Sequence, residues 1–390
     1  MAQTMSTMEQ ALKIYYIDAI RYQLNDKVSP WLARVERNSK DISGSKAKMA
    51  LKYGVSGGVG ARDEYGNLPI PSARKYQQAE WETKNIYGRI RISDKLMKAS
   101  RNRKGAFVSQ LDAQLEDLLT DTKLDVSRQS MGDGTGKLFT VGAAGASNST
   151  TVPVDNVQYL MENMLIDFIT KSSGDEVKTD CRIVAIDRDA KTILLDKKVT
   201  VASTEIGVIA GAYNKEMTGL AKVFDHTNFE TIYGINRTNN KWFRTNTVNV
   251  NNEISEVKIQ EGLDEVEIAA GEPVDFLISS YGVRRAYLYY MSSQKRIVNT
   301  IEIKGGFKAP EFNGIPLVAD RFMPAKTMYG LTTKDWNLYE IGDWDWMAED
   351  GAILSRTADK AAYEATLIKY ADLGCSKLRG QVQFTNITEH

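Results

Sequence analysis

The sequence is poor in the two residue types that most metal sites and many catalytic sites use. Among 390 residues there are two cysteines, Cys181 and Cys375, and two histidines, His226 and His390. The cysteines lie far apart, and neither has a second thiol nearby in sequence. This spacing excludes a disulfide framework and a CxxC zinc knuckle, and it predicts two reduced, packed cysteines. Because His390 is the last residue, imidazole chemistry is restricted to one internal site.

Long apolar segments are also absent. No run approaches the roughly 18 apolar residues of a membrane-spanning helix. The amino-terminal residues MAQTMSTMEQALK lack the basic and then apolar order of a secretory signal. The composition is 42% hydrophobic, 26% charged and 9% aromatic, which is typical of a globular protein and excludes collagen, a coiled-coil rod and wholesale disorder. We therefore expect synthesis in the cytoplasm and no membrane partner.

Opposite charges balance over the whole chain but are unevenly placed along it. The sequence has 50 basic and 50 acidic side chains. Residues 71–104 carry ten basic and three acidic side chains, and residues 1–50 carry eight and five. The rest of the chain is therefore net acidic, so in a self-associating protein the basic segment of one copy would lie on an acidic surface of another. A solvated charged face and non-specific contact with nucleic-acid phosphates are the alternatives.

The first third of the sequence predicts a helix, a long loop and a returning strand. Residues 8–24 place apolar side chains at helical spacing, up to a break at Ser29-Pro30. Residues 44–71 hold many glycines and no apolar periodicity, and irregular segments of this length usually carry function. Residues 81–93 alternate polar and apolar side chains, which is typical of the returning strand of a long hairpin.

The strongest helix pattern runs from Gly105 to about Ser130. Its apolar stripe consists of Phe107, Leu111, Leu115, Leu118, Leu119, Thr122 and Val126. At about 1.5 Å per residue this helix would be about 37 Å long, enough to lie across the surface of a body and support it. The segment GDGTGK follows, and then GAAGASNSTT up to Pro153, whose composition predicts a linker or exposed loop.

Beyond Pro153 the sequence predicts a mixture of helices and short strands. The predicted helices cover 155–169, with Asp155 as N-cap, 253–270 and 281–294. Two strands and a tight turn in CRIVAIDRDAKTILLD open a small β unit. Later strands are predicted at 273–279, 298–303, 315–318, 328–332, 363–371 and 381–387. The class is α+β, with an internal β insertion and a strand-rich carboxyl-terminal third.

Three motifs suggest chemistry, and each has a structural alternative. GDGTGK lacks the first glycine and the Ser or Thr of a phosphate-binding loop and follows a helix, which favours a glycine-rich turn. No nucleophile elbow accompanies His226. The segment DWDWMAED offers the carboxylates Asp343, Asp345, Glu349 and Asp350 but lacks the glycine and final glutamate of a calcium loop. We therefore predict no catalytic, cofactor or metal site.

The order of the predicted elements resembles that of the major capsid proteins of tailed bacteriophages, the Hong Kong 97 type of fold, over nearly the whole chain. The similar motifs are GDGTG at 132–136 after the long helix, PVDFLISS at 273–280 followed by Val283, and NGIPLVAD at 313–320 followed by Pro324 and Tyr329. The resemblance implies an N-arm, an extended β-hairpin loop, a spine helix, a peripheral domain and an axial domain. Their implied bounds are 1–50 for the N-arm, 51–95 for the extended loop, 96–154 for the spine helix and start of the peripheral domain, 155–294 for the axial domain with a β insertion at about 177–215, and 295–390 for the axial-to-peripheral return strands.

The resemblance also implies a function. It implies a non-enzymatic subunit that assembles through hexamers and pentamers into an icosahedral head around the double-stranded DNA of a tailed phage. Further implied partners are a scaffolding protein, a portal, a decoration protein and, non-specifically, the packaged DNA. The protein would reside in the virion after synthesis in the host cytoplasm. An encapsulin-type bacterial compartment shell and a carboxylate-dependent soluble hydrolase are the alternatives.

The loop, the basic segment, the long helix and the acidic segment supply candidate subunit contacts. The candidates are Gly57, Gly58, Gly60, Arg62, Arg89, Arg91, Lys95, Leu115, Leu119, Trp344 and Trp346. Glycines give the loop a backbone that adapts to different neighbours, and the two tryptophans are expected to pack against the body or against a neighbouring subunit. Gly132, Asp133, Gly134 and Gly136 form the predicted turn after the spine helix.

Overall fold

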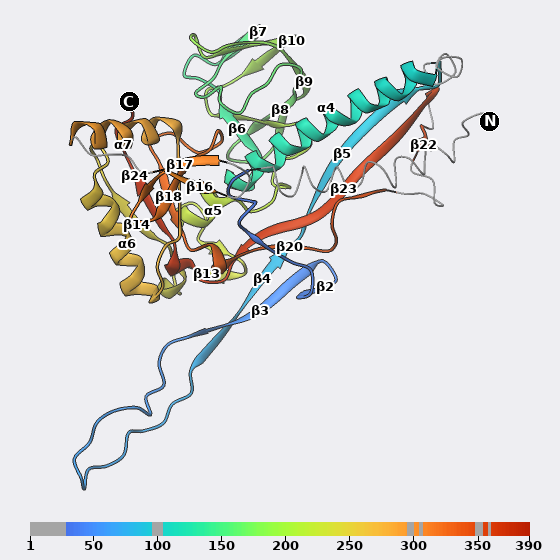
Figure 1. Ribbon diagram of the computed structural model, residues 1–390. Helices are drawn as coiled ribbons and strands as arrows, with labels where there is room; N and C mark the ends of the chain where they lie inside the picture. The colour runs from blue at the N-terminus through green and yellow to red at the C-terminus, as the bar shows by residue number, and fades with distance from the viewer. Residues whose placement is uncertain (1–28, 96–103, 295–299, 304–306, 348–353, 358–359) are drawn as a thin grey trace.

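The computed structural model describes residues 29–95, 104–294, 300–303, 307–347, 354–357 and 360–390. The helix predicted over residues 8–24 lies outside them. The described chain is a mixed α+β structure with four visible parts: a long helix lying on strands, a projecting hairpin, a small β unit, and a sheet covered by two helices (Figure 1). Both cysteines are free and buried, as predicted.

The long helix lies along a sheet whose strands come from both ends of the chain (Figure 1). The elements are α4 (Lys104–Met131), β5 (Lys84–Ser93), β23 (Ala362–Cys375), β20 (Trp336–Glu340), β21 (Asp345–Trp346), β22 (Ser355–Arg356) and β1 (Glu36–Asn38). β5 and β23 pair antiparallel over their full common length, and β20 pairs with the other edge of β23. Gly88 lets the helix approach, because a Cβ there would lie 2.9 Å from Cδ1 of Leu118. The predicted spine helix is confirmed.

A hairpin projects from this sheet and ends in a long loop (Figure 1). It consists of β2 (Ile42–Ser43), β3 (Lys46–Tyr53) and β4 (Lys75–Glu82). The strand predicted over 81–93 is in fact parts of two strands, because the chain leaves the hairpin at Thr83. The amide of Thr83 donates to the carbonyl oxygen of Ser45 at 3.0 Å, and β5 then pairs with β23 instead of β3.

The third part is a six-stranded antiparallel β unit inserted after α4. Its strands are β6 (Lys137–Thr140), β7 (Ala146–Pro153), β8 (Leu165–Thr170), β9 (Glu176–Asp187), β10 (Thr192–Val201) and β11 (Glu205–Ile209), in the order β6-β11-β8-β9-β10-β7. A bridge between Val141 and Val154 joins the two edges and closes the sheet into a small barrel. Phe139 fills the interior so tightly that a Cβ on Gly207 would lie 2.1 Å from its ring.

The barrel corrects two sequence predictions. Residues 142–153, predicted as a linker or exposed loop, include the whole of β7, whose Val152 is fully buried. Residues 155–169, predicted as a helix, contain turns and then β8. Asn163 has φ 70° in this segment, a conformation incompatible with a helix. The six strands of the β unit run from Lys137 to Ile209.

The fourth part is a seven-stranded sheet in the order β14-β24-β19-β15-β18-β17-β16. Its strands are β14 (Asn246–Asn249), β24 (Val382–Thr385), β19 (Met328–Leu331), β15 (Phe276–Ser279), β18 (Ile315–Ala319), β17 (Phe307–Phe312) and β16 (Thr300–Ile303). The helices α6 (Glu256–Ala270) and α7 (Tyr281–Ser293) share one apolar core with Leu277, whereas the adjacent Phe276 faces the core below α4. Serine N-caps start both helices, and Gly271 at φ 69° ends α6. Both helices and the strands β15, β16, β18, β19 and β24 were predicted and are confirmed with small shifts at their ends, whereas β14 and β17 were not predicted.

Short elements connect the barrel to this sheet. They are α5 (Leu220–Phe224), β12 (Thr231–Ile232), β13 (Ile235–Asn236) and the 3-10 turns η2 (Lys241–Phe243), η3 (Thr333–Asp335) and η4 (Leu378–Gly380). Arg237 is fully buried here. Its guanidinium donates to the carbonyl oxygens of Val223 at 2.6 Å and Asp225 at 2.8 Å, and so closes the end of α5.

Candidate functional site

The loop between β3 and β4 carries apolar side chains with no cover in the protomer. The exposed fractions are 81% for Val55, 85% for Val59, 97% for Tyr65, 85% for Leu68 and 85% for Ile70. The predicted interface residues Gly57, Gly58, Gly60 and Arg62 lie in this loop and are also exposed. Single exposed apolar residues are common, but five within 16 residues of a projecting loop are typical of a contact surface.

The loop has a defined shape in spite of its exposure. At its neck, the amide of Gly57 donates to Oγ of Ser72 at 2.8 Å, and Oγ of Ser56 donates to the carbonyl oxygen of Ser72 at 2.9 Å. Near its tip, Nε of Arg62 donates to the carbonyl oxygen of Asn67 at 3.1 Å. These bonds hold the two legs together, so the apolar side chains are presented outward.

Contacts with the body fix the direction of the hairpin. The rings of Tyr53 and Trp242 stack at 4.5 Å between centroids with an interplanar angle of 5°. The amide of Glu80 donates to the carbonyl oxygen of Tyr233 at 2.9 Å. The hairpin is therefore held at both strands where it leaves the body.

A second uncovered surface lies on the sheet face turned away from α4, which we call the outer sheet face. Gly88 faces α4, so its neighbour Tyr87 points the other way and is 57% exposed. Ile341 and Met347, 48% and 59% exposed, bond through their amides to Tyr370 and Thr366 of β23. The outer sheet face thus carries an apolar group built from several strands.

The basic candidates Arg89 and Arg91 border this group. Both ion-pair with Glu364 on β23, with Nη2 of Arg91 at 3.4 Å from its Oε2. Hydrogen bonding from Arg89, and then its charge and that of Arg91, lower the pKa of Glu364 below its usual value. Both arginines are thus already paired within the chain, whereas Lys95 is exposed.

Four predicted interface residues lie inside the protomer. Leu115 is 2% exposed, Leu119 7%, Trp344 1% and Trp346 5%, and all four belong to the core between α4 and its sheet. Other residues of the same chain already cover the apolar surface of these four side chains, so they form an intramolecular contact and not the predicted subunit contact. The sequence pattern identified them correctly as buried residues but could not tell which surface covers them.

The GDGTG turn forms as predicted and brings two distant segments together. Gly134 and Gly136 have φ of 78° and 81°, where side chains are strained. Oδ1 of Asp133 accepts from the amide of Thr135 at 2.9 Å. The chain returning from the barrel then packs on the end of α4, where a Cβ on Gly219 would lie 2.4 Å from the carbonyl oxygen of Gln129.

A buried ion pair fastens this return segment to α4. Nη1 of Arg128 donates to Oε2 of Glu216 at 2.9 Å and Nη2 to Oε1 at 2.5 Å, while Nη2 also reaches Oδ1 of Asp125 at 2.7 Å. The side chains of Arg128 and Glu216 are 7% and 4% exposed. Burial opposes the charge on Arg128, but Glu216 and Asp125 outweigh it and raise its pKa. Burial also raises the pKa of Glu216, against the opposing charge of Arg128.

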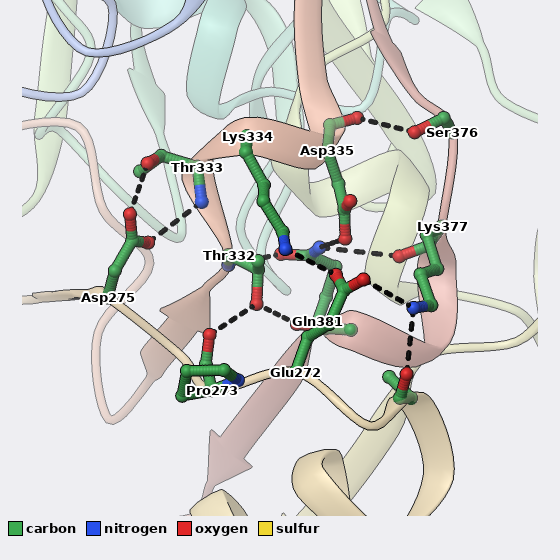
Figure 2. Close-up of polar contacts among 12 residues, drawn as sticks. Glu272, Pro273, Asp275, Thr332, Thr333, Lys334, Asp335, Ser376, Lys377 and Gln381 are labelled. Carbon is green, nitrogen blue, oxygen red and sulfur yellow. Dashed lines mark hydrogen bonds and ion pairs between the residues drawn. The ribbon is translucent and has the colours of Figure 1, made fainter.

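A polar network joins the seven-stranded sheet to the sheet below α4 (Figure 2). Glu272 lies between Lys334, at 3.1 Å, and Lys377, at 3.0 Å. Hydrogen bonding from Lys377, with help from Lys334, lowers the pKa of Glu272. Gln381 is fully buried at the centre. Its Oε1 accepts from the amide of Thr332 at 3.0 Å and from Nε1 of Trp336 at 2.9 Å.

Gln381→Leu should lower the free energy of unfolding by about 2–4 kcal/mol, because two buried donors lose their acceptor and each costs about 1–3 kcal/mol. Urea unfolding followed by tryptophan fluorescence measures the change. Gln383→Leu, two residues further along on β24, is the matched control and should change stability by less than about 1 kcal/mol, because Gln383 is partly exposed. Equal losses for the two variants would contradict the role of the network.

Residues considered for chemistry do not assemble into a catalytic site among those the structure describes. His226 lines an open pocket with Asp133, Asp225 and Thr227, and no serine or cysteine lines that pocket. Burial, and then Arg237 and Arg244, lower the pKa of His226. Over the described ranges, no group of three or more His, Cys, Asp or Glu side chains is placed to hold a metal; Glu349 and Asp350 lie outside those ranges. No helix in the described part of the chain is long and apolar enough to cross a membrane.

Comparisons with solved structures find capsid proteins. A capsid asymmetric unit of cyanophage A-1(L) matches with a TM-score of 0.58 and 12% identity, covering 94% of this chain and 92% of that one. The holo-SrpI encapsulin of Synechococcus elongatus matches with a TM-score of 0.48 and 8% identity, covering 92% of this chain and 88% of that one. The capsid of an empty GTA particle matches with a TM-score of 0.48 and 10% identity, covering 92% of this chain and 91% of that one. No family model and no curated protein matches the sequence.

The chain therefore has a viral capsid fold. It is the Hong Kong 97 type of fold found in the major capsid proteins of tailed phages, and the match extends over nearly the whole chain.

Proposed function

We propose that this chain is the major capsid protein of a tailed phage and self-assembles through hexamers and pentamers into a head that encloses double-stranded DNA. The observation that carries the proposal is the projecting loop with five apolar side chains, each at least 81% exposed, on a chain with a capsid fold. Exposing these side chains in a lone protomer costs free energy, and burying them against another copy recovers it.

The outer sheet face is the proposed receptor for the loop of another copy. The loop projects away from its own sheet (Figure 1), and the described residues of the same protomer leave Tyr87, Ile341 and Met347 exposed. The loop of a second copy would cover them. The contact joins two different surfaces, so each copy offers one loop and one receptor. Such contacts form closed rings where the rotation between neighbouring copies closes, as we propose for hexamers and pentamers. Many modest contacts of this kind add up to a stable shell.

The remaining assignments belong to the same proposal. The arm at 1–50, the extended loop at 51–95, the spine helix and start of the peripheral domain at 96–154, the axial domain at 155–294 and the return strands at 295–390 take the roles that the capsid fold implies. A scaffolding protein, a portal, a decoration protein and the packaged DNA are the proposed partners, and the virion the proposed location.

Negative-stain electron microscopy of the purified full chain, with a sizing column, tests the function. Closed shells, tubes, or rings of five or six support it. Shells isolated with a protein cargo and no DNA would instead favour an encapsulin-type compartment. A monomer across the whole accessible concentration range would contradict the proposal and favour the soluble hydrolase.

Tyr87→Ser combined with Met347→Ser tests the receptor. Burial of one large apolar side chain is worth about 1.5–3 kcal/mol, so the apparent association constant should fall at least about tenfold. Light scattering against protein concentration measures it. Val184→Ser, a 51% exposed position on the barrel, is the control and should assemble normally. Equal assembly of the double variant and wild type would place the receptor elsewhere.

A further inference from the structure

Asp372 is a buried carboxylate at a place where four elements meet. It lies on β23 and is 3% exposed. Its Oδ1 accepts from the amide of Thr218 at 2.6 Å, in the segment that returns from the barrel to α5. Lys84 at the start of β5 and Lys222 on α5 are the charged groups that face it, and neither forms a close ion pair with it. A carboxylate in this position is costly unless its charge is neutralised.

The return segment 216–219 is held from two sides. On the helix side, Glu216 pairs with Arg128, and the amide of Met217 donates to Oε1 of Gln129 at 3.3 Å. On the strand side, Asp372 accepts from Thr218. Tyr233, in the turn between β12 and β13, also contacts β23. Its hydroxyl donates to the carbonyl oxygen of Leu373, next to Asp372, at 3.0 Å. The bond from Asp372 therefore joins the segment between the barrel and α5 to β23.

We infer that Asp372 is a proton-operated latch, which holds segment 216–219 on β23 when its carboxyl group is protonated and releases it when the group is ionised. In the closed arrangement the carboxyl group is shielded from water. Ionisation creates a buried charge that only hydration or a close cation can compensate. Opening the segment hydrates the charge, whereas the helix-side contacts keep the segment attached to α4.

The direction of the pH dependence follows from linkage. Burial raises the pKa of Asp372 to about 7, against the opposing effects of the Thr218 amide and of Lys84 and Lys222. An opened, hydrated aspartate has a pKa near the ordinary value of about 3.9. The closed form therefore binds the proton more tightly and is favoured at acidic pH. It loses stability relative to the open form as the pH rises from about 4 to about 7, and the loss levels off above that, where both forms are ionised.

Hydrogen–deuterium exchange of the full chain tests the latch. From about pH 6 to about pH 8.5, exchange of peptides covering 216–224, divided by the intrinsic rate, should rise roughly tenfold in wild type. Asp372→Asn keeps an oxygen acceptor for Thr218 without a charge, so its exchange should stay low at both pH values. Peptides of β10 in the same sample serve as the internal control.

Glu216 is the competing titratable group, because burial raises its pKa too. An Asp372→Asn variant with the wild-type pH dependence would overturn the inference and assign the effect to Glu216. Absence of pH dependence in wild type would overturn it as well. If Asp372→Asn does not fold, Lys222→Met replaces it. Loss of a facing cation should move the midpoint of the wild-type transition to higher pH, and an unchanged midpoint would contradict the latch.

Discussion

Glu216→Gln is expected to lower the free energy of unfolding by about 3 kcal/mol. The substitution leaves Arg128, 7% exposed, with Asp125 as its remaining charged partner, and breaking a buried ion pair at one partner typically costs about 3–5 kcal/mol. The lower end applies because Asp125 stays and because glutamine keeps one acceptor oxygen. Urea denaturation followed by circular dichroism gives the free energy from the midpoint and the slope.

Two further variants separate the ion pair from its surroundings. Replacing both residues, Arg128→Met with Glu216→Leu, removes the uncompensated charge and should be less destabilising than Glu216→Gln alone. Glu364→Gln breaks the surface ion pairs with Arg89 and Arg91 and should be much less destabilising than Glu216→Gln, because the two arginines are half exposed and screened by water. A loss below about 1 kcal/mol for Glu216→Gln itself would mean that the pair does not hold the return segment on α4.

Local signals in the sequence predicted the elements that depend mainly on their own residues. The spine helix has a long apolar stripe, and α6 and α7 have serine N-caps, with Gly271 in the left-handed region ending α6. The backbone groups of such helices form their hydrogen bonds within the segment itself, so the local sequence pattern is sufficient to predict the helix. Most strands of the seven-stranded sheet were predicted for a similar reason, since they are short apolar runs bounded by turns. β14 and β17 were not predicted.

The barrel shows where local patterns fail. Residues 155–169 place apolar side chains close enough to helical spacing to predict a helix, yet Ile166 and Phe168 face the barrel interior from a strand. Asp167 lies between them, buried, and accepts from the amides of Asp180 at 2.8 Å and Gly211 at 2.7 Å. These partners are 13 and 44 residues away. Contacts with residues distant in sequence therefore determine that this segment is a strand, and a short sequence window does not contain those residues.

The candidate interface was predicted in part. Glycines and prolines marked the projecting loop, because an irregular segment of that length has few other roles. The outer sheet face was missed, since Tyr87, Ile341 and Met347 become neighbours only when β5, β20 and β23 pair. Leu115 and Trp344 were placed at a subunit contact because an apolar stripe does not reveal whether it is covered by the same chain or another.

Replacing the apolar side chains of the loop should abolish assembly and leave the protomer stable. The variant carries Val55→Ser, Val59→Ser, Tyr65→Ser, Leu68→Ser and Ile70→Ser. Each side chain is at least 81% exposed in the protomer, so little burial is lost on unfolding and the change in stability should stay within about 1 kcal/mol. In the contact between copies, burial of each of these side chains is worth about 1.5–3 kcal/mol. Losing all five would remove most of the free energy of a weak, repeated contact, and assembly should stop.

Electron microscopy and a sizing column measure assembly, and thermal unfolding measures the stability of the protomer. Val257→Ser with Ile268→Ser on α6, exposed by 74% and 86%, is the control for a general loss of surface hydrophobicity and should assemble like wild type. A loop variant that still forms closed particles would show that its apolar side chains are not the contact. Loss of assembly in both the loop variant and the α6 variant would assign the effect to solubility, because α6 lies on a different part of the molecule from the loop (Figure 1).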